Sequence, residues 1–302
     1  MEIEKSFITT DGVKIGYRGP AEPLAGAPAV LLIHGLASNL TRWSEFVEHT
    51  RLHRQCNVYR IDLRGRQRSV HRGIITRKKW IRDILEFLQQ ESIAKVIIIG
   101  HSLGAQVAQE FACAHPDKTL GVVYIDPVYP ENLHGTLHTV KRYKWLIKLV
   151  LWTVLLFTRL GIYRREYAPR DLHQLDIDTR ATLEANPQLR ISDLYMSPKA
   201  DLEYIPLSSY IQDLLSVAQA MCAPERITVP VRVLLSSGAS VSSYDKNIAI
   251  IHRYPDYGIT EIQADHWLLT EQPTAAREAL EQFVDEIMSP QQPAQSGSAA
   301  SV

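Results

Sequence analysis

The chain has 302 residues, of which 45% are hydrophobic, and its 33 lysines and arginines balance its 33 aspartates and glutamates. This composition is that of an ordinary soluble globular protein, long enough to bury a full apolar core without disulfides or a metal. The charge is unevenly placed, because residues 51–82 carry eleven lysines and arginines against Asp62 alone. We favour a solvated basic face that is balanced by acids elsewhere, with a site for phosphate or another anion as the alternative, and we predict no nucleic-acid partner.

Apolar runs typical of β-strands recur along the chain, and several are continuously apolar instead of alternating. A parallel sheet that is covered by helices on both faces requires such strands. The runs therefore predict an α/β fold. They lie at residues 13–17, 29–33, 58–61, 96–99 and 122–125 and, after a long interruption, at 231–235 and 259–262.

Helical stretches separate these runs, as parallel strand order demands. In one of them Ile81, Ile84, Leu85 and Leu88 recur at a spacing of three and four residues, which gives one apolar stripe for packing on the sheet. The predicted helices lie at residues 40–48, 78–90, 103–114, 245–253 and 274–288.

The strand–helix rhythm breaks between residues 128 and 226, where helical segments at 141–160 and 207–221 are joined by polar linkers. We predict that residues 128–226 form a helical cap over one edge of the sheet. The sheet and its helices are then formed by residues 1–127 and 227–288. Residues 289–302 are poor in apolar side chains, and we predict a disordered tail there.

The predicted strand at 96–99 runs directly into Gly100-His101-Ser102-Leu103-Gly104 and then into a helix. A Gly-x-Ser-x-Gly pattern in this context is typical of a nucleophile elbow, where a serine is exposed on a strained strand-to-helix turn. The two glycines are needed because larger side chains would collide at the turn. Ser102 is therefore the predicted nucleophile, and the Leu103 N–H at the helix start is a predicted oxyanion donor.

Two further segments complete the predicted site. The strand at 29–33 ends in His34-Gly35-Leu36, where the small Gly35 lets the backbone turn, so Leu36 is the second predicted oxyanion donor and His34 a structural residue. His266 is the predicted general base, because it follows the strand at 259–262 and comes late in the chain, as the order serine, acid, histidine demands. His101 is predicted to pack beside the nucleophile.

Together these residues resemble the landmarks of the α/β-hydrolase fold superfamily, in particular its capped serine hydrolases of the esterase, lipase and cofactor-free haloperoxidase kind. The resemblance covers nearly all of residues 1–288 and includes the segment Asp62 to Ser69 and Asp265-His266-Trp267. It implies a mostly parallel eight-stranded sheet, flanked by helices, with the helical cap inserted after strand six. No metal or organic cofactor is implied.

Three features depart from the family pattern. Gln67 and Asp265 stand where glycines are usual, and Val241 stands where the usual acid would follow strand seven. The acid of the triad must then come from elsewhere or be missing. We favour Asp126, at the tip of the sixth strand, from which some family members supply their acid, and Asp245 at a helix start is the alternative.

These residues predict hydrolysis of a carboxylic ester through an acyl-enzyme on Ser102, with a preference for apolar acyl or aromatic esters. Hydrolysis of an amide, a lactone or a carbon–carbon bond stays open, as does a non-catalytic ligand-binding protein of the same fold. The apolar cap helix is expected to line an acyl pocket. The predicted substrate-binding residues are Trp145, Leu151, Trp152, Leu155 and Trp267.

The length of the same helix indicates whether it could span a membrane. The uncharged part of residues 145–160 is ten residues long, whereas a membrane span needs about 20, so we predict no transmembrane segment. Peripheral contact of this helix with a membrane surface is an alternative to its burial in the cap.

The cysteines and the N-terminus indicate the compartment. Cys56, Cys113 and Cys222 show no C-x-x-C pattern and are predicted to be core thiols. Together with an N-terminus unlike a secretory signal, they predict a cytoplasmic protein.

Overall fold

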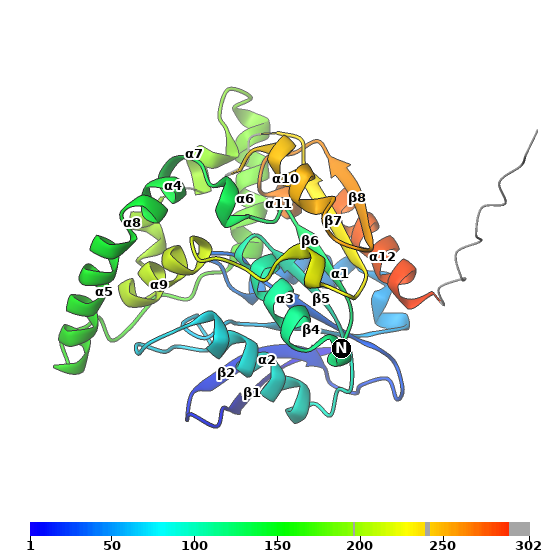
Figure 1. The fold of residues 1–302 in the computed structure, drawn as a ribbon, viewed down its shortest axis with the longest axis horizontal. Coiled ribbons are helices and arrows are strands. Elements are labelled where there is room, and N and C mark those ends of the chain that lie inside the picture. The colour runs from blue at the N-terminus through cyan, green and yellow to red at the C-terminus, as the bar shows by residue number, and fades with distance from the viewer. Residues whose placement is uncertain (196, 239–241, 290–302) are drawn as a thin grey trace, which may run out of the picture.

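The computed structural model describes residues 1–195, 197–238 and 242–289, and one twisted sheet lies at its centre (Figure 1). The eight strands of the sheet are β1 (Glu2–Ile8), β2 (Lys14–Pro20), β3 (Ala29–Ile33), β4 (Asn57–Ile61), β5 (Val96–His101), β6 (Thr119–Ile125), β7 (Val231–Ser236) and β8 (Tyr257–Ile262). Their order is β1-β2-β4-β3-β5-β6-β7-β8. The pairs β1–β2 and β2–β4 are antiparallel and all other pairs are parallel, so the predicted mostly parallel eight-stranded sheet is confirmed.

The first strand of the sheet was not expected. β1 pairs with β2 along its whole length, from Glu2 opposite Pro20 to Ile8 opposite Lys14. Among its side chains only Phe7 is buried, because an edge strand needs to cover little apolar surface. A strand with so weak an apolar pattern is hard to recognise from sequence.

Helices cover both faces of the sheet. The helices that belong to the sheet layers are α1 (Ser44–His49), α2 (Arg77–Gln90), α3 (Leu103–Ala114), α10 (Tyr244–Ile251), α11 (Leu268–Glu271) and α12 (Pro273–Met288). Leu31 and Ile33 of β3 belong to the core shared with α2, α3 and α10, whereas Val30 and Leu32 belong to the core shared with α1 and α12. This alternation follows from the two-residue period of a strand, and it buries β3 on both faces.

Between β6 and β7 the structure is helical, as expected. The helices there are α4 (Gly135–Arg142), α5 (Lys144–Arg159), α6 (Leu172–Ala185), α7 (Ile191–Tyr195), α8 (Pro198–Asp201) and α9 (Leu207–Val217). The single helix expected at 141–160 is two helices, because the backbone leaves the helical conformation at Tyr143. The division at residues 128 and 226 into separate domains stays a prediction, and the expected tail falls, from residue 290 onward, outside the described residues.

The basic run at residues 51–82 is only in part the solvated face that its composition suggested, because four of its eleven cations are buried. Arg60, Arg64, Arg66 and Arg77 are buried. Each of these four side chains forms an ion pair with a carboxylate from another part of the chain, as in the pairs Arg60–Glu2, Arg64–Asp83, Arg66–Asp213 and Arg77–Glu110. Buried cations require such partners. Asp83 directly follows the run, whereas Glu2, Glu110 and Asp213 lie further away in the sequence, so the local charge count overestimated the positive surface.

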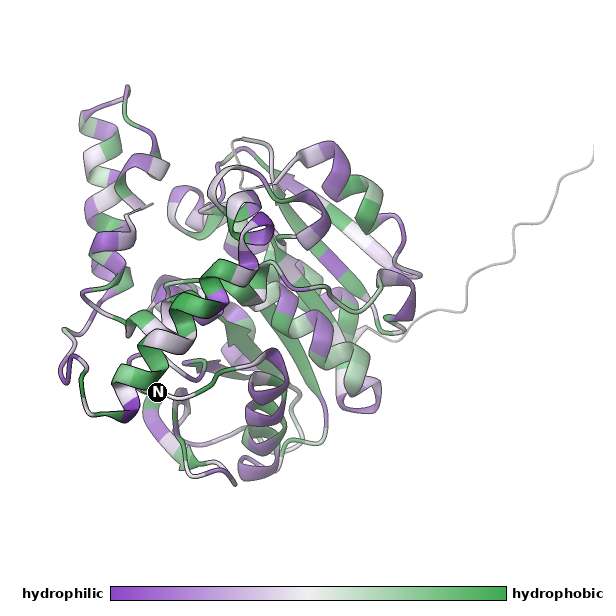
Figure 2. Ribbon diagram, turned by 60° about the vertical axis from the view of Figure 1, so that its left-hand side comes forward, coloured by the Kyte–Doolittle hydropathy of each residue, from purple (hydrophilic) through white to green (hydrophobic). Residues whose placement is uncertain are grey.

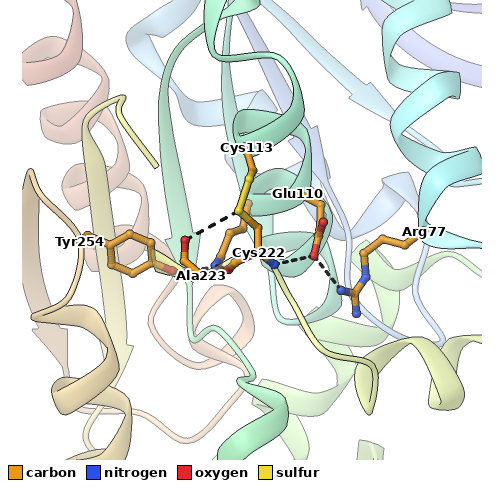
Figure 3. Close-up of a disulfide and its surroundings, with 7 residues drawn as sticks. Arg77, Glu110, Cys113, Cys222, Ala223 and Tyr254 are labelled. Carbon is orange, nitrogen blue, oxygen red and sulfur yellow. Dashed lines mark hydrogen bonds and ion pairs between the residues drawn. A yellow bond between two sulfur atoms is a disulfide. The ribbon is translucent and has the colours of Figure 1, made fainter. Parts of the chain in front are cut away.

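Two of the three cysteines form a disulfide, which corrects the prediction that all are free core thiols. Cys113 of α3 is bonded to Cys222, which follows α9, and their Cα atoms are 6.5 Å apart (Figure 3). The backbone N–H of Cys222 also donates to the Glu110 carboxylate, which pairs with Arg77. The bond joins residues 109 positions apart, a pairing that spacing does not reveal. Cys56 is free and buried.

The disulfide also removes one argument for a cytoplasmic location. Such bonds persist mainly in oxidising environments, so the cysteines no longer point to a reducing one, and the cytoplasmic assignment stays a prediction. No helix within the described ranges is long and apolar enough to cross a membrane.

Candidate active site

Ser102 stands at the sharp turn between β5 and α3. Its backbone is in the left-handed region, with φ 54° and ψ −112°, and α3 begins at the next residue. A Cβ at Gly100 would collide with the backbone of Gly104, and a Cβ at Gly104 would collide with the carbonyl oxygen of Ile33. The two glycines are therefore needed because three stretches of backbone meet at this turn.

The structure brings Ser102, His266 and Asp126 together at the carboxyl edge of the sheet. The His266 Nε2 atom lies 3.0 Å from the Ser102 Oγ atom. The Nδ1 atom of the same ring is hydrogen-bonded to the Asp126 Oδ2 atom. All three side chains are buried. Ser102 lies in the turn after β5, Asp126 directly follows β6, and His266 lies in the loop before α11. A nucleophile, a base and an orienting carboxylate in this order are the arrangement of a catalytic triad.

Asp126 is fixed by the sheet on its other side. Its Oδ1 atom accepts hydrogen bonds from the Ser236 backbone N–H at 3.2 Å and the Ser236 hydroxyl at 2.8 Å. Its backbone has a φ of 41°, which turns the chain out of β6. Asp245, the alternative acid, is a first-turn residue of α10, where a carboxylate stabilises the helix dipole. The neighbouring Val241 lies outside the described residues.

Two neighbours orient the His266 ring. The His101 Nε2 atom lies 3.1 Å from the His266 backbone carbonyl oxygen. Burial lowers the pKa of His101 to about 3, so the His101 ring is neutral and donates this hydrogen bond from Nε2. Trp267 packs its ring edge-to-face with that of His266, with centroids 5.5 Å apart. His101 thus packs beside the nucleophile and also holds the loop of the expected base.

The two expected oxyanion donors are Leu103, which follows Ser102, and Leu36, which lines the same cavity as Ser102. Leu103 is the first residue of α3, so its N–H has no acceptor within the helix. Gly35 and Leu36 line the cavity in front of Ser102. His34 is turned away from it: its Nε2 atom accepts from the Leu63 N–H at 3.1 Å, and burial lowers its pKa to about 3.

A cavity of about 250 Å³ opens above Ser102 and His266. Nine of its twenty lining residues come from the helices between β6 and β7, and sequence reasoning did not single out any of these nine. Tyr210, Leu214 and Val217 of α9 form one side, and their spacing of four and three residues was a recognisable signal of a common face. The other apolar wall residues include Val128, Leu137, Leu172, Tyr195 and Trp267.

Of the five predicted substrate-binding residues, only Trp267 lines this cavity. Leu151, Trp152 and Leu155 line a separate groove between α5, α9 and α2, and Trp145 is exposed to solvent. The prediction is therefore wrong for these four residues of α5. The reason is that α9 packs between α5 and the cavity, with one face toward each.

The charged side chains of the cavity are paired with each other or with near neighbours. Arg42 forms an ion pair with Asp176, and its Nη1 atom also donates to the Thr270 hydroxyl at 2.8 Å. Arg170 pairs with Asp201 at 2.7 Å. Each cation thus has a carboxylate beside it, and the wall is close to neutral overall. The described part of the chain holds no group of three or more His, Cys, Asp or Glu side chains arranged for a metal ion.

Comparison with known proteins agrees with this geometry. Residues 30–279 match the model of the alpha/beta hydrolase family. Ethanol acetyltransferase 1 of Wickerhamomyces ciferrii is 24% identical over 226 residues, which are 72% of this chain but only 58% of that protein.

Solved structures are similar over almost the whole chain. A hydrolase from Pseudomonas aeruginosa PA01 superimposes with a TM-score of 0.68 and 19% identity, over 93% of this chain and 98% of that one. A thermophilic esterase from Thermogutta terrifontis superimposes with a TM-score of 0.65 and 19% identity, over 96% of this chain and 100% of that one. At such identities the likeness shows the fold alone.

Proposed function

The chain belongs to the alpha/beta hydrolase family, and on that premise we propose that it hydrolyses a carboxylic ester through an acyl-enzyme on Ser102. The observation that carries the proposal is the continuous chain of contacts from the Ser102 hydroxyl through the His266 ring to the Asp126 carboxylate. Ser102 and His266 also line a cavity that admits a small molecule. We assign Ser102 as the nucleophile, His266 as the base and Asp126 as the acid.

In the first step His266 Nε2 takes the hydroxyl proton of Ser102 as the oxygen attacks the ester carbonyl. The negative charge on the carbonyl oxygen is stabilised by the N–H groups of Leu36 and Leu103, and Asp126 stabilises the imidazolium. His266 then gives the proton to the leaving alcohol, and an acyl-Ser102 remains. Water, deprotonated by His266, releases the acid and restores the serine.

The cavity supports an uncharged substrate with an apolar acyl or aromatic group. Leucine, valine and aromatic side chains make up nine of its twenty lining residues, and the arginines in it already have carboxylate partners. A free anionic group would find no uncompensated cation among the described residues of the wall. With about 250 Å³ of space, the cavity fits esters of short or medium length better than long acyl chains.

Acyl transfer to an alcohol is the second candidate. It uses the same acyl-enzyme, with an alcohol in place of water in the second step, and the name of the Wickerhamomyces ciferrii relative favours it. Amides, lactones and carbon–carbon bonds next to a carbonyl stay further alternatives, because the triad does not distinguish them.

A panel of nitrophenyl esters from acetate to dodecanoate tests the proposal. We expect turnover that is highest for short or medium chains and falls by a factor on the order of 10⁴ or more in Ser102→Ala. Ser38→Ala, which changes another buried serine of the same cavity, is the matched control and is expected to keep activity within about tenfold. Undiminished turnover in Ser102→Ala would exclude the serine mechanism.

Two additions to this assay separate the alternatives. Added ethanol should yield the ethyl ester if the acyl group is transferred to alcohols, and only the free acid if water is the acceptor. A fluorophosphonate probe should label the native protein and not Ser102→Ala. Absence of labelling together with absence of turnover would favour the ligand-binding protein without catalysis.

A further inference from the structure

Helix α5 turns an apolar face toward solvent. Trp145, Leu149, Trp152 and Leu156 follow one another at the spacing of a single helix face, and they are 64%, 62%, 61% and 57% exposed. A second row beside them is also apolar and exposed, and it consists of Leu146, Val150, Phe157 and Leu160. Figure 2 shows α5 as a largely hydrophobic ribbon on the near side of the molecule.

This face is left open by the packing of the helix. Leu155 is the one buried residue of α5, and the helix contacts α9 and α4 through its inner side. Figure 1 places α5 at the edge of the molecule, far from the sheet. Contiguous exposed apolar surface of this kind is rare on monomeric proteins unless it binds something.

The charged residues that α5 and its flanking segments contribute are all of one sign. Residues 132–165 contain no aspartate or glutamate. The cations there are exposed and cluster before, at the start of and after α5, at Lys141, Arg142, Lys144, Lys148, Arg159, Arg164 and Arg165. An apolar face bordered by cations alone is complementary to an interface in which acyl chains lie beneath anionic headgroups.

We propose that α5 is a membrane-docking helix, which lies in the interface of a bilayer that contains anionic lipids. The apolar face would enter the region between headgroups and acyl chains, and the cations at both ends would contact the headgroups. With 16 residues the helix is about 24 Å long, and its lysines and arginines at both ends keep it parallel to the surface.

A second copy of the chain fits this face less well. In a symmetric dimer through α5 the same surface meets itself, so the cations of one copy would face the cations of the other. Helices that pair through an apolar face normally carry complementary charges beside it. Since residues 132–165 supply no carboxylate, the anionic partner must come from elsewhere.

The proposal goes beyond ester hydrolysis and gives a reason for the position of the cavity. Helix α4 directly precedes α5, and its Thr136 and Leu137 line the cavity above Ser102. A docked α5 would therefore place one wall of the cavity near the lipid surface. Membrane binding itself needs no turnover, so it can be tested whether or not the chain is an esterase.

Cosedimentation of the full chain with vesicles tests the proposal. At low salt we expect binding to vesicles of phosphatidylcholine with 30% phosphatidylglycerol, on the order of tenfold or more above binding to pure phosphatidylcholine, and a loss of binding as salt is raised. The fluorescence of the exposed Trp145 and Trp152 should shift to shorter wavelength on binding, because water leaves their surroundings.

Paired variants locate the contact on α5. Leu149→Gln/Leu156→Gln should weaken binding about tenfold or more, and Ile8→Gln/Leu24→Gln, which changes exposed apolar residues elsewhere, should leave it within about twofold. The charge variant is Lys144→Glu/Lys148→Glu, expected to weaken binding to the anionic vesicles about tenfold or more. Its matched control, Lys14→Glu/Lys95→Glu, reverses two other exposed lysines and should have little effect.

Three results would overturn the proposal. The first is absence of binding to the anionic vesicles, and the second is binding that the α5 variants and their controls change equally. The third is a dimer in light scattering that Leu149→Gln/Leu156→Gln dissolves, because the occupant of the face would then be a second copy. Since all substitutions are at exposed positions, unchanged thermal unfolding will show that each variant is folded.

Discussion

Helices α3 and α5 are both rich in apolar residues, yet α3 is buried and α5 is largely exposed to solvent. Nine of the 12 residues of α3 are buried, whereas Leu155 is the one buried residue among the 16 of α5. The difference lies in their neighbours, because α3 packs on β5, β6 and α2, whereas the main contacts of α5 are with α9 and α4, which like α5 belong to the inserted helices between β6 and β7. An apolar helix sequence thus predicts that the helix binds an apolar surface, but it does not say which one.

The candidate site likewise combines residues at the edge of the sheet with residues of the inserted helices. The expected reacting groups lie on the sheet side, at the ends of β5 and β6 and in the loop after β8. Backbone hydrogen bonds join Ser102 to Ile125 and Asp126 to Leu234, and the His101 ring holds the carbonyl of His266. The inserted helices contribute the wall of the cavity. We therefore expect substitutions at the sheet edge to change the chemical step and substitutions on the inserted helices to change substrate choice.

After the loss of Ser102 itself, the largest expected effect tests this division with two buried carboxylates, Asp126 and Asp201. Asp126→Asn should lower kcat by about 10²–10⁴, because a neutral amide does not stabilise the His266 imidazolium. Asp201→Asn, on α8 and paired with Arg170, is the matched control and should lower kcat by less than about tenfold. Turnover of the best nitrophenyl ester is the measurement.

Asp245→Asn completes this comparison, because Asp245 is the alternative acid. As a first-turn residue of α10 it is expected to change kcat little. If Asp245→Asn lowered kcat as much as we expect for Asp126→Asn, the assignment of the acid would be wrong. An equal loss in Asp201→Asn would instead show that the inserted helices take part in the chemistry.

The next effect concerns stability and compares two phenylalanines directly. Phe111 of α3 is fully buried, and Phe111→Ala should lower the free energy of unfolding by about 3–5 kcal/mol through lost burial and a cavity. Phe157 of α5 is 48% exposed, and Phe157→Ala should stay within about 1 kcal/mol of the native protein. Urea unfolding of both variants is the measurement, and similar losses would mean that α5 is covered by an intramolecular contact.

The sequence predicted the sheet side of the molecule well because its signals are local. Ser102 lies between glycines that the turn requires, and Asp126 directly ends an apolar strand, so strand order alone places both at one edge. The parallel arrangement of the strands then brings His266 to the same edge, since it follows β8.

Other parts of the molecule depend on contacts between distant segments, which a sequence pattern does not contain. The wall residues Tyr195 and Leu172 lie on short helices joined by loops, whose packing follows no single period. The Cys113–Cys222 bond and the acids that neutralise residues 51–82 are likewise set by tertiary packing. The burial of α5 was inferred from its composition, and composition cannot distinguish a core from a docking surface.

The last expected effect is the response of the sheet side to acid. Burial lowers the pKa of both His34 and His101 to about 3, against about 6.5 for a histidine in the unfolded chain. Between these values the unfolded chain binds a proton at each position and the folded chain does not. The stabilising contribution is therefore fully present above about pH 6.5 and is lost as the pH falls toward 3, by up to about 1.4 kcal/mol per pH unit for each histidine.

Urea unfolding at a series of pH values from 7.5 to about 4.5 measures this slope. His101→Gln should reduce the slope by the share of one histidine, and it should also raise the mobility of the His266 loop, because the hydrogen bond to the His266 carbonyl is weakened. His252→Gln, which changes an exposed histidine, is the matched control for the slope. Helix α5 contains no His, Asp or Glu, so acid should weaken the sheet side while the cations beside the docking helix stay charged. An unchanged slope in His101→Gln would show that this ring does not remain neutral in the folded protein.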